Sequence, residues 1–380
     1  MRFLCILFVV LTTVACKEKH VPFIVVGSAS YSHEDVAQYA TYFGYDDSIA
    51  EAKFVEYALL KEASATVPEN LKEVEKLYYK LVTPVLYSFL KKESLKSKAL
   101  LTDEYFKKLF ILDYDFYLIP ANYIKREHKK TVKPGDLPVP IDFLLAHAKI
   151  GDSFTRIETK HGFFDITVLG IHQGTPPSPD IQQTINNALA MALTFQDIKE
   201  RHRFQFFPEY VSQEGSSEIV VSFNKTDLSV VDIEKATLLP VKFEERYHAM
   251  RYFGEMKLLE HHFAAEVRVL RKYCHDLARI KTYQDTYFKN HKDATTLLLG
   301  DTYDTIIISD GINDETIILF PDMASLADVK KDDVIMYNKK KMTVTKRFTQ
   351  KTSIVVVEEY MLRQLFKELQ SRISVKKFSP

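Results

Sequence analysis

The sequence predicts an α+β protein in which helical segments are combined with small antiparallel sheets, and it predicts that this combination is duplicated. Three observations support this fold class. The 380 residues are 46% hydrophobic and 27% charged, a composition typical of folded chains and sufficient for two or three domains. Short runs of β-branched residues end at polar turns, which is typical of strands. Longer runs repeat apolar residues at helical spacing, as at Ala52, Val55, Leu59 and Ala63.

Residues 1–15 are predicted to be a signal peptide, followed by a lipidated tether over residues 16–22. A basic start precedes an uncharged apolar run of 13 residues. As a helix this run spans about 20 Å, too short to cross a hydrocarbon layer of about 30 Å, and its small-residue end is typical of a secretory signal. The sequence T-V-A-C that ends at Cys16 resembles a bacterial lipobox, with Thr13 where a leucine is usual. We therefore expect Cys16 to be acylated; the alternative is an ordinary secretory signal in which Cys16 is incidental.

A strand, a turn and two helices are predicted to follow, and the same order recurs later in the chain. The first copy begins FIVVGSASYSHEDVAQ at Phe23, where Ser32 before two acidic residues is a helix start. The second copy begins EIVVSFNKTDLSVVDIEKA at Glu218 and starts a short helix near Asp232. We therefore predict matching helical domains over residues 23–100 and 218–290.

A second pair of matching segments predicts two small sheets. The motif K-I-G-D at residues 149–152 and the motif K-K-D-D at residues 330–333 each precede two strand-like runs and then a helical pattern. We expect one sheet domain over residues 101–178, a helix and linker over residues 179–217, and a second sheet with a C-terminal helix over residues 291–380. A tandem duplication explains both pairs; the alternative is that strand–helix pieces look alike in any α+β protein.

The charge balance and the cysteine content exclude several functional classes. Basic and acidic residues each number 51, so the chain has no net charge with which to hold a nucleic-acid backbone, and we expect no nucleic-acid partner. Three cysteines, at Cys5, Cys16 and Cys274, are too few for a disulfide framework, and we expect Cys274 to be a buried free thiol. No glycine-rich phosphate loop or nucleophile elbow occurs, so we predict no cofactor.

One pair of side chains has the spacing of a metal site. His262 and Glu266 are four residues apart, so a continuous helix would place them on one face, where they could hold a divalent metal. Because a third ligand is missing, we interpret them as surface residues of a long helix and predict no metal site.

The two helical segments and the sheet motifs together resemble a known family. The strand ending at Val25 and Val26, the acidic helix start at Glu34 and the helix over residues 54–60 are similar to the N-terminal segment of the SurA and PrsA type periplasmic foldases. Those proteins pair a helical chaperone domain with parvulin-type peptidyl-prolyl isomerase domains. The motif at residues 149–152, followed by G-F-F and I-T-V-L, resembles the closing strands of a parvulin domain, and Y-L-I-P at 117–120 lies where its first strand begins.

The resemblance implies a parvulin-like pocket that has lost its catalytic residues. In the family, a histidine-centred polar network lies beside an apolar proline pocket, whereas here the first-strand histidine position is Tyr117 or Leu118 and the last-strand position is Phe164. The degenerate pocket would consist of Tyr117, His161, Phe163, Phe164 and Asp165. We predict no catalytic residue and expect prolyl isomerase activity to be lost or marginal.

The resemblance and the aromatic content together predict a chaperone. The chain has 26 phenylalanines and 21 tyrosines, and Tyr247, Tyr252 and Phe253 lie among charged helical residues, which suits either capture of unfolded chains or helix packing. We expect an exported lipoprotein, anchored through Cys16 in the membrane of a bacterial cell envelope and facing the periplasm, whose partners are unfolded or exported proteins. The alternatives are an active prolyl isomerase and a non-catalytic envelope scaffold that binds one fixed partner.

Overall fold

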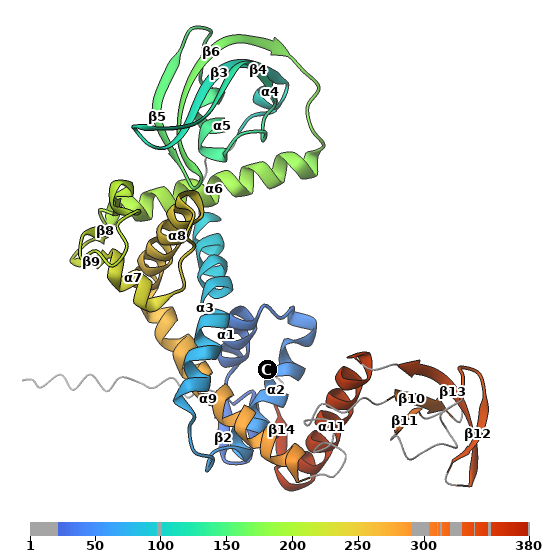
Figure 1. Cartoon of the computed structure of the whole chain (residues 1–380). Helices are drawn as coiled ribbons and strands as arrows, with labels where there is room; N and C mark the ends of the chain where they lie inside the picture. The colour runs from blue at the N-terminus through green and yellow to red at the C-terminus, as the bar shows by residue number, and fades with distance from the viewer. Residues whose placement is uncertain are drawn as a thin grey trace, which may run out of the picture. The chain divides into compact units, whose positions relative to one another are not determined.

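The computed structural model describes an α+β chain with small antiparallel sheets (Figure 1). The predicted signal peptide and Cys16 lie outside the residues that it describes. None of the described helices combines the length and the apolar character needed to cross a membrane. Two compact units make up the chain, a first unit of Met1–Tyr78 with Arg271–Pro380 and a second unit of Tyr79–Leu270. The described ranges are 22–96, 101–290, 304–309, 311, 314–319, 329–337, 339–348 and 351–378.

The first unit begins with the strand, turn and helices that the sequence predicts. A hairpin is followed by a helix whose N-cap, Ser32, forms a capping box with Asp35: each side chain accepts a backbone N–H of the other residue. The elements are β1 (Ile24–Val26), β2 (Ala29–Tyr31), α1 (His33–Phe43), α2 (Asp47–Ala63) and the start of α3 (Leu71–Ser94).

The first unit also contains the second predicted sheet and a C-terminal helix. The sheet has the strand order β11-β10-β13-β12, and the strands β10 and β11 form an antiparallel hairpin. The last strand, β14, pairs with β1 and places Lys377 opposite Ile24. The elements are the end of α9 (Ala264–Lys289), β10 (Asp304–Ser309), β11 (Asp314–Leu319), β12 (Val334–Tyr337), β13 (Lys340–Phe348), α11 (Lys351–Arg372) and β14 (Val375–Lys377).

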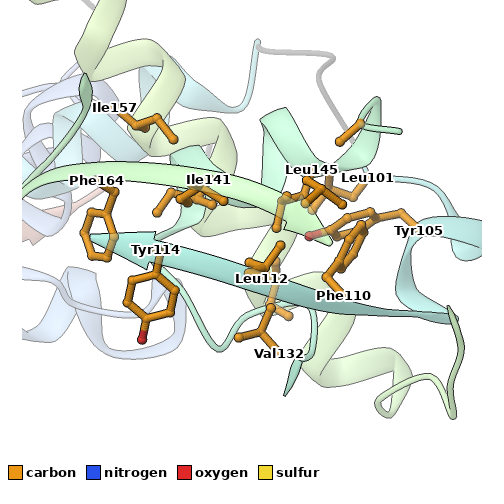
Figure 2. Packing of buried hydrophobic residues seen from close by; sticks show 14 of the residues in the cluster. Leu101, Tyr105, Phe110, Leu112, Tyr114, Val132, Ile141, Leu145, Ile157 and Phe164 are labelled. Atoms are coloured by element: carbon orange, nitrogen blue, oxygen red, sulfur yellow. The ribbon is translucent and has the colours of Figure 1, made fainter. Parts of the chain in front are cut away.

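The second unit contains a four-stranded sheet in the segment 101–178, where the sequence predicts the first sheet domain. Its strand order is β4-β3-β6-β5, all antiparallel, and one face of the sheet packs against α4, α5 and α6. Side chains from these elements, among them Leu112, Ile141, Leu145 and Phe164, form one buried cluster (Figure 2). The elements are α4 (Asp103–Phe106), β3 (Lys108–Ile119), β4 (Asn122–Val132), α5 (Val139–Ala146), β5 (Ser153–Thr159), β6 (Gly162–Gln173) and α6 (Pro179–Arg201).

A three-stranded sheet and two helices complete the second unit. The strand that the sequence predicts at residue 218 forms a hairpin with the residues after its turn, and this hairpin pairs with a short strand that follows α6, which gives the order β7-β8-β9. The elements are β7 (Gln205–Phe206), a 3-10 turn (Pro208–Tyr210), β8 (Ile219–Phe223), β9 (Thr226–Ser229), α7 (Val230–Ala236), α8 (Phe243–His262) and the start of α9.

The two hairpins have the same local structure. Ser229 caps α7 and forms a capping box with Asp232, as Ser32 does with Asp35 at α1. In both cases the hairpin strand ends directly at the cap, so the chain passes from sheet to helix without a loop.

The two motifs that precede the closing hairpins also have the same hydrogen bonds. Asp152 accepts the Lys149 N–H through Oδ2 at 2.8 Å, and Asp333 accepts the Lys330 N–H in the same way at 2.7 Å. The third residue has positive φ in both motifs, +92° at Gly151 and +74° at Asp332. Each motif therefore forms the same turn and leads into an antiparallel hairpin.

Candidate functional site

The residues of the predicted parvulin-like pocket do not form one pocket but divide into two groups, one on each face of the sheet. Tyr117 on β3 and Phe163 on β6 are register partners on the face of the sheet that points away from α4, α5 and α6. Their rings stack there with 5.7 Å between the ring centroids. The Tyr117 hydroxyl donates to Asp165 Oδ1 at 3.0 Å, and burial together with this carboxylate raises the pKa of Tyr117 to about 12. Phe164 lies on the opposite face and is buried beside Phe116. The prediction of a single pocket is corrected here, because successive strand residues point to opposite faces.

A groove lies on the face of the sheet that carries Phe164, between this face and the helices of the second unit. Its volume is about 1150 Å³, and its walls come from β3, the loop before α5, the β5–β6 turn and the helices α3, α6 and α8. Two of the predicted pocket residues, Phe164 and His161, lie in this wall. Most of the lining is aromatic or aliphatic: Tyr87, Leu90, Tyr114, Phe116, Leu137, Phe164, Met191, Phe195, Tyr252 and Leu259.

Two of the tyrosines that line the groove are also exposed to solvent. Tyr87 on α3 is 40% exposed and Tyr252 on α8 is 44% exposed, although both side chains line the groove. The Tyr252 hydroxyl donates to Thr83 Oγ1 at 3.3 Å, which joins α8 to α3 at this point. The sequence placed Tyr247 and Tyr252 among charged helical residues, as surface for capture or for helix packing. In the structure Tyr252 is exposed, whereas Tyr247 is fully buried, as the helix-packing alternative expects.

A buried ion-pair network closes one side of the groove. Arg251 on α8 is 2% exposed; it donates to Glu158 Oε1 on β5 at 2.6 Å and to Glu255 Oε1 at 3.2 Å. Burial alone would lower the pKa of Arg251, but Glu255 and Glu158 hold it above its usual value. Lys199 on α6 contacts the same Glu255 oxygen at 2.7 Å. These four side chains therefore brace β5, α6 and α8 against one another.

A second recess lies beyond this ion-pair network. It has a volume of about 890 Å³ and lies beside the β3–β4 turn, the end of α6 and the segment around β7. Glu158, Lys199 and Arg251 line both the recess and the groove. The network is therefore a wall shared by two openings.

Two histidines of the groove are held neutral. Burial lowers the pKa of His161, and Lys160, His248 and Arg251 lower it further. Burial and Arg251 also lower the pKa of His248. Neither histidine is positioned against a carboxylate in a catalytic arrangement, so the groove offers binding surface with a few polar groups.

The sequence reasoning missed the contribution of α6 to the groove. Ala188, Met191, Ala192 and Phe195 recur at helical spacing and line the groove from one helical face. This periodicity was a usable signal for an apolar face. Its partners on α3 and α8 are distant in sequence, and no local pattern indicates that the three helices meet.

The pair of His262 and Glu266 does not share a helical face. Helix α8 ends at His262 and α9 begins at Ala264, so the continuous helix assumed from the sequence is wrong. His262 is also not a surface residue, because its side chain is 14% exposed and contacts Glu93 on α3. Within the described residues, no group of three or more histidine, cysteine or acidic side chains is arranged to hold a metal ion.

The cysteine prediction is confirmed for Cys274. This residue lies on α9 as a buried free thiol, and burial raises its pKa to about 11. Such a thiol is a poor nucleophile at neutral pH, because the thiolate is the reactive form.

Comparison with known proteins gives no relative. No protein-family model matches the chain, and neither a curated protein nor a solved structure is significantly similar to it.

Proposed function

We propose that this protein is an exported, lipid-anchored chaperone that holds unfolded segments of other proteins in the groove of its second unit, with prolyl isomerase activity lost or marginal. The observation that carries the proposal is the groove itself. Pockets for small molecules have volumes of roughly 300–1,000 Å³, and this groove, at about 1150 Å³, leaves room for a stretch of polypeptide.

The chemistry of the lining supports capture of varied apolar segments. Tyrosine and phenylalanine rings supply large contact areas, and a methionine such as Met191 adapts its shape to different side chains. Lys125, Asp136 and Lys160 also line the groove and provide charged positions beside the apolar surface. Such a surface favours breadth of binding over selection of one ligand.

The SurA-like and parvulin-like identity belongs to the same proposal. A four-stranded antiparallel sheet forms in the segment where the resemblance expects the parvulin-like domain, and two capped hairpins begin the segments expected to be SurA-like. The common hydrogen bonds at Asp152 and Asp333 support an ancient duplication. The separation of Tyr117 and Phe164 onto opposite faces supports loss of the isomerase site.

Aggregation assays with groove variants test the proposal. We expect the wild-type chain to suppress aggregation of several unrelated unfolded proteins at near-stoichiometric amounts, and Y87S/Y252S to lose most of this effect. Leu238→Ser is the matched control, because Leu238 is 99% exposed and does not line the groove. Equal suppression by the groove variant and the control would overturn the assignment to the groove.

Two further outcomes separate the alternatives. Acceleration of cis–trans exchange in a proline peptide would replace the proposal with an active isomerase. A scaffold that binds one fixed partner would suppress aggregation of no unrelated protein. Anchoring is tested separately by labelling with a radioactive fatty acid, which we expect to mark the wild-type protein and not the C16S variant.

A further inference from the structure

A chain of hydrogen-bonded side chains links three helices and one hairpin of the second unit. His202 Nε2 lies 3.0 Å from His262 Nδ1, and His262 Nε2 lies 3.1 Å from Glu93 Oε2. On the other side, Asn224 Nδ2 lies 2.9 Å from His202 Nδ1 and 3.0 Å from His261 Nε2. The chain therefore joins the ends of α3, α6 and α8 with the β8–β9 turn.

This histidine chain lies one helical turn from the groove. Each of the three helices carries a groove residue three positions before a member of the chain, and residues three apart are neighbours on a helix surface. The pairs are Leu90 with Glu93, Lys199 with His202, and Leu259 with His262. The histidine chain therefore lies next to the groove wall on all three helices.

With the Asn224 amide nitrogen facing both His202 and His261, the hydrogen bonds are satisfied in one protonation state. The Glu93 carboxylate can only accept a hydrogen bond, so His262 carries its hydrogen on Nε2. Its Nδ1 is then unprotonated and acts as an acceptor. His202 must then donate through Nε2 and accept at Nδ1 from the Asn224 amide. The second N–H of the Asn224 amide is directed to His261. Every link is satisfied when each histidine holds a single hydrogen.

A second proton on a chain histidine breaks this pattern. On His262 it would place two N–H groups face to face with His202, and on His202 it would oppose the Asn224 amide. The charged neighbours are Glu93 on α3, which contacts His262, and Arg201 on α6, which lies 3.1 Å from Glu93.

The charge environment agrees with this geometry. Burial lowers the pKa of His202, and His262, His261 and Arg201 lower it further. Burial would raise the pKa of Glu93, but His262 and Arg201 lower it overall, so Glu93 stays anionic. Because the folded protein holds His202 neutral more strongly than the unfolded chain does, the stability that it contributes is fully present above about pH 6.5, the ordinary pKa of a histidine, and is lost as the pH falls from there through the lowered pKa of the folded state.

We propose that the histidine chain is an acid-sensitive clasp that holds one end of the groove closed at neutral pH and loosens it on acidification, so that the bound segment is released. Release of a bound segment rests on the proposed function. The loosening of the helix ends does not, and it is measurable without a client.

Hydrogen exchange on the full-length protein tests the clasp. At pH 5.5, after correction for the intrinsic exchange rate, we expect the backbone of residues 86–95, 196–203 and 255–263 to exchange at least tenfold faster than at pH 7.5. His202→Gln should abolish this response, because glutamine supplies one donor and one acceptor but cannot gain a proton. His172→Gln, at an exposed histidine of β6, is the matched control.

Binding of a tryptophan-containing apolar peptide tests release. The chain has no tryptophan, so the emission reports the peptide alone. In the wild-type protein and in H172Q, we expect peptide binding to be at least fivefold weaker at pH 5.5 than at pH 7.5. In H202Q, we expect equal binding at the two pH values. If H202Q does not fold, H262Q makes the same comparison, because glutamine can accept from His202 and donate to Glu93.

The outcomes separate the two proposals. An equal exchange response in H202Q and wild type overturns the clasp, and faster exchange with unchanged peptide binding overturns release. If no peptide binds at either pH, the proposed function fails, while the exchange comparison still decides the clasp.

Discussion

The guanidinium of Arg251 on α8 donates through Nη2 to Glu158 Oε1 on β5, with 2.6 Å between the two atoms. This contact joins the sheet β4-β3-β6-β5 to a helix across the wall that separates the groove from the recess. Because Arg251 is 2% exposed, its partners must be retained for the wall to be stable.

Replacement of Arg251 is expected to destabilise the second unit strongly. Arg251→Met removes the cation nearest to Glu158, whose side chain is 42% exposed, and leaves Glu255 paired with Lys199 alone. Removal of one member of a fully buried ion pair costs about 3–5 kcal/mol, and with one partner exposed we expect a loss of about 2–3 kcal/mol. The free energy of unfolding is followed by circular dichroism in urea. Arg203→Met, at an exposed arginine that lines the recess, is the control and should cost less than about 0.5 kcal/mol. A loss below about 1 kcal/mol in R251M would show that the network is not structural.

Asp142 is expected to make the protein more stable as the pH falls toward 4. This side chain is 1% exposed; its Oδ1 accepts from the Tyr105 hydroxyl, and its Oδ2 has no hydrogen-bond partner among the described residues. Burial raises the pKa of Asp142 from 3.8 to about 6. The folded state therefore favours the protonated acid, and this contribution is full below pH 3.8 and lost as the pH rises through 6.

The Asp142 contribution corresponds to about 3 kcal/mol, at roughly 1.4 kcal/mol for each unit of pKa. The amide that replaces the carboxyl group in the D142N variant cannot titrate, so we expect the free energy of unfolding of this variant to depend less on pH than that of the wild type between pH 4.5 and 7.5. Urea titrations at several pH values measure the difference. Parallel curves for the two proteins would contradict the assignment.

The two capping boxes are expected to contribute alike to the two units. Ser32→Ala removes the side-chain acceptor at α1, and Ser229→Ala removes it at α7; each loss costs about 1 kcal/mol. Thermal unfolding of the two single variants and of the double variant measures this. Because the caps lie in different units, the two losses should add. Ser30→Ala, at an exposed position of β2, is the control and should leave the melting temperature unchanged.

Cys274 is expected to resist alkylation in the folded state. A thiol with a pKa of about 11 carries about 100-fold less thiolate at pH 8 than an ordinary cysteine. Mass spectrometry of the peptide that contains Cys274, after treatment with iodoacetamide, should show modification only when the protein is unfolded in urea. Equal rates in both conditions would mean that the site opens readily.

The local parts of the fold could be predicted from the sequence. The S-x-x-D pattern at Ser32 and Ser229 beside β-branched runs specifies both the hairpins and the helix starts, because a capping box needs only residues three positions apart. The turn at Asp152 is local in the same sense and leads into the strands expected there.

The site could not be predicted, because its parts meet only in three dimensions. His202 and His262 are 60 residues apart, and no pattern in either helix indicates the other. Tyr117 and Phe164 were grouped because they align with histidine positions of the family that the sequence resembles, although strand alternation sends them to opposite faces. The break at Phe263 was missed because neither glycine nor proline marks it.

The pairing of β14 with β1 determines when the first unit can finish folding. Ile24 pairs with Lys377, which is synthesised last among the strand residues. The hairpin β1–β2 therefore emerges early and stays without its third strand until almost all of the described chain has been made. The sheet β7-β8-β9 needs only neighbouring segments, and the unit that carries the groove can close once residue 270 is available. Such distant pairing is slow and leaves a strand edge open in the interval. A chain that emerges N-terminus first would thus complete the unit that carries the groove before its own first sheet.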